Sequence, residues 1–225
     1  MNHAIVRMLL AATALLLSSG AWAASAGRAG KAEFTFYPIL TESKNYNGAN
    51  GASADVDTGW GLGFGWAYNF DDHWSAGVDL EWSSANYTGT TTPGVGNSNA
   101  SYRFNETLDT STLRFSGTYN FSPDAFTFFV TGGLGVTYVD TGVPSGPPTL
   151  TCWWYPYWGE VCGTAQPTKS STDFSYNAGI GARWDMPGRQ RYYFRGLLNQ
   201  QWVDIGGSVN TLSFLQLRFD FGIKF

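Results

Sequence analysis

Few side chains in this sequence could carry out acid–base or nucleophilic chemistry. The chain has two histidines, and one of them lies in an N-terminal leader described below. The other, His73, falls in a predicted turn, where a catalytic base with its partners is implausible. Asp79 and Glu81 could imitate the carboxylate pair of a glycosidase, but they have many charged neighbours and no evident cleft. The residue types therefore predict that the protein is not an enzyme.

The two cysteines, Cys152 and Cys162, bracket a run of aromatic residues. In an exported protein, two nearby cysteines most simply form one disulfide, and a closed loop this short is worth about 2–4 kcal/mol on the chain-entropy account. No histidine or further cysteine accompanies the pair, so we expect no metal. The aromatic run could bind a glycan or a protein, or it could rest on lipid headgroups, and the sequence leaves both open. Its members are Trp153, Trp154, Tyr155, Tyr157 and Trp158, and the flanking Pro144, Pro147, Pro148 and Pro167 argue against additional strand.

The amino terminus predicts an export signal. Residues 1–7 carry one positive charge, residues 8–17 are almost all apolar, and Ala21-Trp22-Ala23 supplies the small residues that a signal peptidase requires. We expect cleavage after Ala23, so that residues 1–23 are removed and 24–225 are exported. The apolar run is too short to cross a bilayer as a helix.

The exported part alternates with period two, which predicts strands. In the last segment, apolar residues at 215, 217, 219, 221, 223 and 225 alternate with polar or small residues. Segments 60–70, 74–83 and 174–185 repeat this pattern clearly, and weaker versions occur at 33–36, 113–121, 126–137 and 192–202. The eight predicted strands run to about ten residues or more, the length that a tilted strand needs to cross a bilayer.

The connections between these segments alternate in length. Tight turns lie at 71–73, 122–125 and 187–190, whereas longer polar loops cover 41–57, 84–105, 140–172 and 205–210. Short turns on one rim and long loops on the other are typical of outer-membrane barrels, in which the short turns are periplasmic. The even strand number places both termini on the periplasmic rim. We therefore predict an all-β fold, an eight-stranded antiparallel up-and-down transmembrane β-barrel with extracellular loops. A formal charge of −4 argues against binding to nucleic acid.

Aromatic residues gather at both ends of the apolar faces. This placement predicts two girdles, one at each membrane interface. Near the short turns they are Tyr68, Phe70, Trp74, Tyr119, Phe121, Phe126, Trp184 and Tyr192, and near the long loops they are Trp60, Trp82, Tyr138 and Trp202.

The final strand, residues 217–225 with a terminal Phe225, resembles the C-terminal signal of bacterial outer-membrane proteins. Together with the eight strands, it makes the chain similar to the small OmpA/OmpW-type barrel superfamily. The resemblance implies outer-membrane residence in a Gram-negative cell and contact with lipid and lipopolysaccharide. It also implies insertion by the barrel-assembly machinery with periplasmic chaperones, with Phe221, Ile223 and Phe225 as the assembly signal. Unlike OmpA, the sequence stops at Phe225, so we expect no periplasmic peptidoglycan-binding domain.

Polar positions of the strands predict a charged lumen. Eight strands enclose just enough room for side chains, so buried charges there must pair. The inward-facing candidates are Glu33, Asp79, Glu81, Arg114, Arg183, Asp185, Arg195, Arg218, Asp220 and Lys224. Glycine-rich segments at 61–65 and 132–135 open no helix, so no dinucleotide cofactor is expected.

Two functions fit this sequence. In the first, salt bridges plug the lumen and the barrel displays its loops for surface interaction. In the second, suggested by the OmpW side of the resemblance, the barrel is a narrow passive channel for small or hydrophobic solutes.

Overall fold

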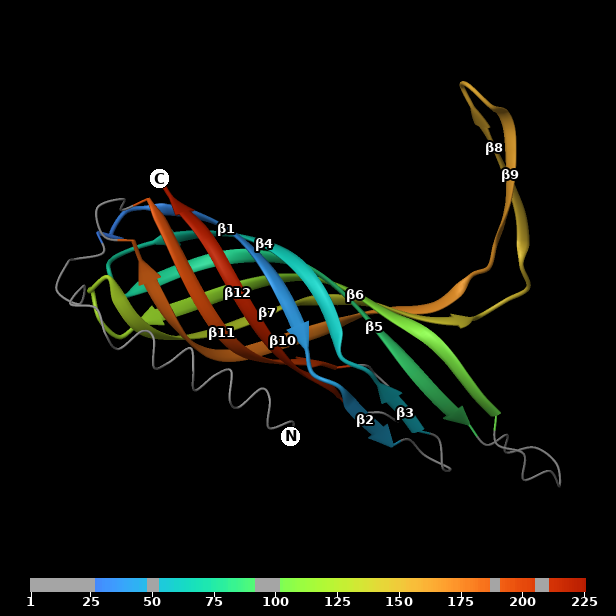
Figure 1. The fold of residues 1–225 in the computed structure, drawn as a ribbon, viewed down its shortest axis with the longest axis horizontal. Helices are drawn as coiled ribbons and strands as arrows, with labels where there is room; N and C mark the ends of the chain where they lie inside the picture. Colours follow the sequence, from blue (N-terminus) through green and yellow to red (C-terminus); the bar gives the residue numbers. More distant parts are fainter. Residues whose placement is uncertain (1–26, 48–52, 92–101, 187–190, 205–210) are drawn as a thin grey trace.

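The computed structural model describes residues 27–47, 53–91, 102–186, 191–204 and 211–225. Eight strands form a ring in which each pairs antiparallel with its neighbours, and β1 pairs with β12 to close it (Figure 1). The fold prediction is thus confirmed. The predicted signal peptide and its cleavage site lie outside the described residues. The ring strands are β1 (Ala32–Thr41), β4 (Gly59–Asn69), β5 (Trp74–Thr91), β6 (Tyr102–Asn120), β7 (Phe126–Pro144), β10 (Thr168–Asp185), β11 (Tyr192–Val203) and β12 (Leu212–Lys224).

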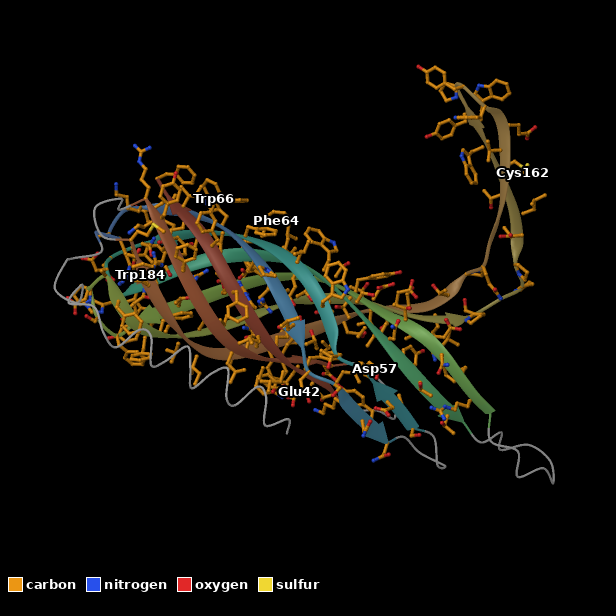
Figure 2. All side chains as sticks on the ribbon, viewed as in Figure 1. Glu42, Asp57, Phe64, Trp66, Cys162 and Trp184 are labelled. Carbon is orange, nitrogen blue, oxygen red and sulfur yellow. A yellow bond between two sulfur atoms is a disulfide. The ribbon has the colours of Figure 1, made fainter. Side chains whose placement is uncertain are left out.

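The period-two alternation of the sequence corresponds to the inner and outer faces of the barrel wall. In β1, every second residue from Glu33 to Thr41 is buried, and the residues between them are exposed. Phe64, Trp66 and Trp184 all stand on the outer surface (Figure 2). Closing the sheet gives every ring strand a paired neighbour on both edges within the barrel wall, as a hydrocarbon environment requires. No helix in the described part of the chain is long and apolar enough to cross a membrane.

The aromatic residues form rows of ring contacts near the short turns. The Trp74 and Tyr119 ring centroids lie 4.8 Å apart, and Tyr119 also contacts Phe121 at 5.5 Å. At the other end, Tyr176 stacks on Trp202 at 5.2 Å, and Trp60 is 65% exposed. These positions match the two predicted girdles.

Four strands continue well past the predicted membrane region. β5 and β10 have 18 residues, and β6 and β7 have 19, so much of the sequence predicted as loops 84–105 and 140–172 is strand. The predicted loop 41–57 contains a small hairpin, β2 (Lys44–Asn47) and β3 (Ser53–Val56), and β3 pairs with β5. Residues 205–210 lie outside the described chain.

The flanking prolines predicted no additional strand in the longest loop, and this prediction is wrong. β8 (Thr149–Tyr155) and β9 (Gly159–Ala165) form a separate hairpin there, which projects away from the barrel at the end opposite the C-terminus (Figure 1). Pro147, Pro148 and Pro167 lie outside these strands and Pro144 ends β7. The prolines therefore lie at the boundaries of the hairpin. There, their missing N–H groups cost no hydrogen bond between the two strands. We call residues 149–165 the aromatic hairpin.

Two inward tyrosines fill the barrel against glycines. A Cβ on Gly222 would lie 2.0 Å from Cζ of Tyr193, and a Cβ on Gly63 would lie 2.2 Å from Cε2 of Tyr37. Both tyrosines are fully buried. Only glycine leaves room for these rings across the strands.

Candidate functional site

All ten charged residues predicted for the lumen lie inside the barrel, and each makes at least one ion pair. Together with Arg28, which the sequence analysis missed, they form what we call the lumen network. It contains six basic and five acidic side chains, and each has at most about a tenth of its side-chain surface exposed.

At the periplasmic end, Arg183 joins two carboxylates. Its guanidinium donates to both Glu33 oxygens, at 2.6 and 3.1 Å, and to both Asp185 oxygens, at 2.9 and 3.0 Å. The ring of Tyr193 lies 4.0 Å from the same guanidinium. Asp185 also accepts from Lys224 at 2.7 Å. The planar fork of arginine suits such paired contacts.

Arg28 closes this end from outside the strands. Its side chain has no exposed surface and contacts Asp185 at 2.9 Å. The guanidinium also donates to the carbonyl oxygens of Asp72, Ser122 and Asp124 at 2.7–3.0 Å, which belong to two different turns. Burial and the nearby Arg183 lower the pKa of Arg28. No periodic pattern surrounds this arginine, because it precedes the first strand.

The middle of the lumen holds a second cluster. Arg218 contacts Asp79 and Asp220, each at 3.4 Å, while Arg195 contacts Asp220 at 2.9 Å. The Tyr37 ring lies 3.5 Å from the Arg218 guanidinium. Asp79, Arg195, Arg218 and Asp220 line a cavity of about 30 Å³, which has room for about one or two water molecules.

Above this cluster, a chain of polar side chains crosses five strands. Arg114 pairs with Glu81 at 3.0 Å, and the other Glu81 oxygen accepts from Gln216 at 2.6 Å. Asn199 donates to Gln216 at 2.8 Å, and Asn177 donates to Asn199 at 2.7 Å. The signal that predicted the charged members missed these amides, although they share the inward phase of their strands.

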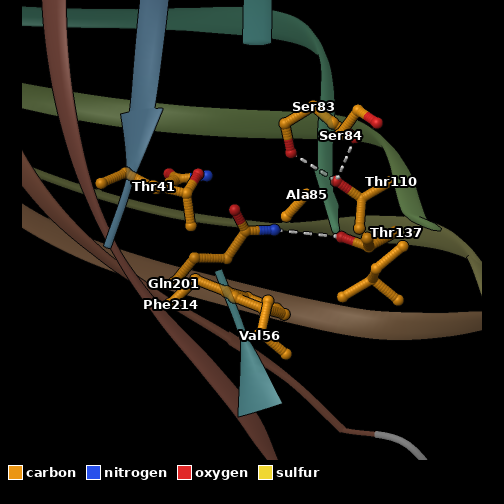
Figure 3. A pocket seen from close by; sticks show the side chains of 11 residues that line it. Thr41, Val56, Ser83, Ser84, Ala85, Thr110, Thr137, Gln201 and Phe214 are labelled. Carbon is orange, nitrogen blue, oxygen red and sulfur yellow. Dashed lines mark hydrogen bonds between the residues drawn. The ribbon is translucent and has the colours of Figure 1, made fainter. Parts of the chain in front are cut away.

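The extracellular half of the interior is largely apolar. Buried side chains from six strands pack together there: Val56, Tyr87, Leu108, Val139, Val203 and Phe214. Below them, Gln201 donates to Thr137 at 3.2 Å beside a cavity of about 20 Å³ (Figure 3). The β2–β3 hairpin covers this region, and the Tyr46 hydroxyl donates to the Ser213 carbonyl at 2.8 Å.

His73 lies in the β4–β5 turn, where its contacts hold the turn against β6. Its Nδ1 contacts the carbonyl oxygen of Asn120 at 2.8 Å, and its ring stacks on Tyr119. In the same turn, Asp71 accepts from the backbone N–H groups of Trp74 and His73, each at 2.7 Å. These bonds favour the ionised carboxylate and lower the pKa of Asp71. The turn shows no nucleophile paired with the imidazole.

The aromatic hairpin presents its side chains to solvent. The predicted disulfide is present, and Cys152 lies directly opposite Cys162. The Trp158 N–H donates to the Tyr155 carbonyl at 3.3 Å, and Gly159 follows with a φ of +76°, which is a three-residue hairpin turn. All five predicted aromatic residues are exposed, from 48% for Trp153 to 90% for Tyr157.

The sequence model of the outer membrane protein beta-barrel domain family matches residues 9–225. The chain belongs to this family. No curated protein sequence matches it. Among solved structures, OprG from Pseudomonas aeruginosa is 16% identical with a TM-score of 0.50, covering 88% of this chain and 97% of OprG. Ail of Yersinia pestis, solved with the heparin analogue sucrose octasulfate, is 10% identical with a TM-score of 0.47, covering 88% and 99%. Neisserial surface protein A is 10% identical with a TM-score of 0.45, covering 86% and 97%.

As a member of this family, the barrel is an integral protein of the bacterial outer membrane. The likeness to OprG shows the fold alone. The exposed apolar surface of the barrel faces lipid, and the short turns face the periplasm. Phe225 donates its N–H to the Ala32 carbonyl at 2.8 Å, so β12 ends beside the start of β1. Phe221 and Phe225 are exposed on the outer surface and Ile223 is partly exposed.

Proposed function

We propose that this outer-membrane barrel is a surface-interaction protein with a lumen closed by salt bridges, and that it displays the aromatic hairpin to partners outside the cell. The observation that carries this proposal is the contrast between the two sites. The lumen network is buried and its members contact one another. The aromatic residues of the hairpin are exposed and contact little else.

The geometry of the lumen supports a closed barrel. Its buried charges are joined by ion pairs, and rupture of a buried pair is costly. The two cavities described above have volumes of about 20 and 30 Å³, enough for about one or two water molecules each. A path for ions would require several of these contacts to break together.

Planar-bilayer recording tests the closed lumen. We expect the wild-type protein to be silent, because the ion pairs persist. Reproducible conductance steps that change in Arg218→Ala or Glu81→Ala would refute the closed barrel. Heat-dependent gel mobility provides the control that each protein is folded before recording.

Adherence of cells that carry the protein tests the hairpin. We expect Trp153→Ala with Trp154→Ala to reduce adherence to glycan- or protein-coated surfaces, while Leu150→Ala does not. Leu150 is a matched control because it lies on the same hairpin and is 71% exposed. Equal adherence of all variants would contradict a display role.

One feature favours a second candidate, a narrow channel for small or hydrophobic solutes. The apolar side chains in the extracellular half, such as Val56, Leu108 and Phe214, could receive such a solute. Passage would then require the lumen network below them to open. Uptake of an apolar solute into vesicles would support this alternative, and its absence would favour the closed barrel.

Assembly follows the family pattern in this proposal. The barrel-assembly machinery and periplasmic chaperones would recognise Phe221, Ile223 and Phe225 on the last strand. The exposed wall beyond the outer girdle would contact lipopolysaccharide. Phe225→Ala is expected to lower the amount of folded barrel in the membrane, measured by heat-dependent mobility.

A further inference from the structure

We infer that the aromatic hairpin is a binding site for neutral saccharides, with Trp154 as the stacking platform and Glu160 as the hydroxyl acceptor. This inference rests on the display role proposed above and names its ligand class. The relevant residues are all in the described part of the hairpin.

The strand pairing places Trp154 and Glu160 side by side. They are directly opposite each other in β8 and β9, so their side chains share one face, with Cβ atoms about 5 Å apart. Cys152 and Cys162 lie on the same face, two residues nearer the barrel. The Glu160 carboxylate lies within 4.8 Å of both sulfur atoms, which are occupied by their disulfide. An aromatic plane therefore stands beside a carboxylate.

Both groups are free to meet a ligand. Trp154 is 75% exposed, and within the described chain the Glu160 carboxylate makes no hydrogen bond or ion pair. By contrast, Trp153 faces the other side and lies over Gly163, where a Cβ would be 3.3 Å from the indole. A pyranose ring has an apolar C–H face that can stack on an indole and hydroxyl groups that can donate to a carboxylate. The pair offers both contacts at once.

The two strands of the hairpin are joined near its tip and at its base. The disulfide joins its strands near the tip, and at the base Ser145 donates through its N–H and its hydroxyl to the Pro167 carbonyl at 2.8 and 3.1 Å. A ligand would meet a platform that is already ordered, so that binding costs little conformational entropy.

Charge selects a neutral ligand over a polyanion. Residues 145–167 contain no lysine, arginine or histidine, and Glu160 is their one acidic residue. A sulfated or phosphorylated partner would meet a carboxylate with no cation nearby, and like charges repel. A lipid bilayer is disfavoured for a related reason, because insertion of the tip would carry the Glu160 carboxylate toward hydrocarbon.

The test uses full-length protein in phosphatidylcholine nanodiscs. Tryptophan fluorescence is followed during titration with maltohexaose, cellohexaose and N-acetylchitohexaose, and with heparin as the polyanion. We expect at least one neutral oligosaccharide to bind, with an affinity that is nearly the same at about 50 and about 500 mM salt, because no ion pair with the ligand is screened.

Three variants assign the binding to the proposed face. Trp154→Ala should weaken binding roughly tenfold, the scale of one aromatic contact, and Glu160→Gln should weaken it severalfold. Leu150→Ala, on the same face, should change it by less than about twofold. The hairpin lies outside the barrel wall, and heat-dependent gel mobility checks that each variant is folded.

Several results would overturn the inference. These are failure of all three neutral oligosaccharides to bind, binding of heparin or of phosphatidylcholine vesicles alone, or neutral binding that survives Trp154→Ala. If binding fails while adherence still depends on the hairpin, the ligand class is wrong and the proposed function stands. If the wild-type barrel conducts ions, the closed-lumen part of the proposed function fails independently of the saccharide result.

Discussion

Loss of Arg183 should be one of the most damaging single changes in the lumen. Arg183→Met removes the four hydrogen bonds to Glu33 and Asp185 and leaves Glu33, which is 1% exposed, as a buried carboxylate. Breaking a buried pair in this way costs about 3–5 kcal/mol. Lys224 lies opposite Glu33 in the strand pairing and is a nearby cation. We therefore expect the free energy of unfolding to fall by about 3 kcal/mol, the lower end of this range.

A second change should reverse part of this loss. With Glu33→Gln added to Arg183→Met, no carboxylate is left without its partner, and we expect about 1–2 kcal/mol of stability to return. Urea unfolding in lipid vesicles, read as the fraction with folded gel mobility, measures both variants. Arg183→Lys is the matched control, because lysine keeps the positive charge but cannot make the paired hydrogen bonds of the planar guanidinium. If the double variant is no more stable than Arg183→Met, charge pairing is not what stabilises this cluster.

Three further changes probe other parts of the barrel by the same unfolding measurement. Arg28→Ala should lower the free energy of unfolding by about 2–4 kcal/mol, because three turn carbonyls and one carboxylate lose a charged donor. Arg28→Lys should recover part of this loss. Equal stability of wild type and Arg28→Ala would contradict the role of Arg28 in closing the periplasmic end. Gly222→Ala should cost about 1–3 kcal/mol by forcing Tyr193 to move, whereas Gly117→Ala, which meets nothing within 4 Å, should cost little; similar effects of the two would refute the steric argument. Because the pKa of Asp71 is lowered in the folded protein, its ionised carboxylate stabilises the fold above the unfolded pKa of about 4, and this stabilisation is lost as the pH falls from there through the folded pKa. The stabilities of wild type and Asp71→Ala should therefore converge in acid. A stability difference that is constant with pH would exclude this linkage.

The alternation of apolar and polar residues was enough to predict the ring and the direction of its side chains. Glu33 and Lys224, at opposite ends of the exported sequence, are predicted to share one lumen because both have the inward phase of their strands. The particular pairs could not be predicted, since they depend on the register between neighbouring strands. Arg183, for example, contacts Glu33 across 150 positions of the sequence.

Other features carried weaker signals. Arg28 stands alone among small residues, and nothing local shows that its side chain reaches two turns. Tyr37 and Tyr193 are aromatic residues at inward positions, a phase that the sequence reading assigned to polar groups; glycine on the facing strand is the signal that could have identified them. Pro156 and Gly159 are the local signal that could have indicated the hairpin turn, because proline and glycine favour turns, and prolines that flank a segment do not prevent strand between them.

The unequal height of the barrel wall has a consequence for the aromatic hairpin. A strand of 19 residues such as β7 extends about 60 Å and, with a tilt of about 40°, rises roughly 45–50 Å along the barrel axis. The apolar band of such barrels is about 25 Å tall, so part of this wall stands clear of the hydrocarbon on the β5–β10 side. β11 and β12, with 12 and 13 residues, end much lower. The tall side of the wall therefore places the base of the aromatic hairpin beyond the apolar band, at a height that suits the display role proposed above.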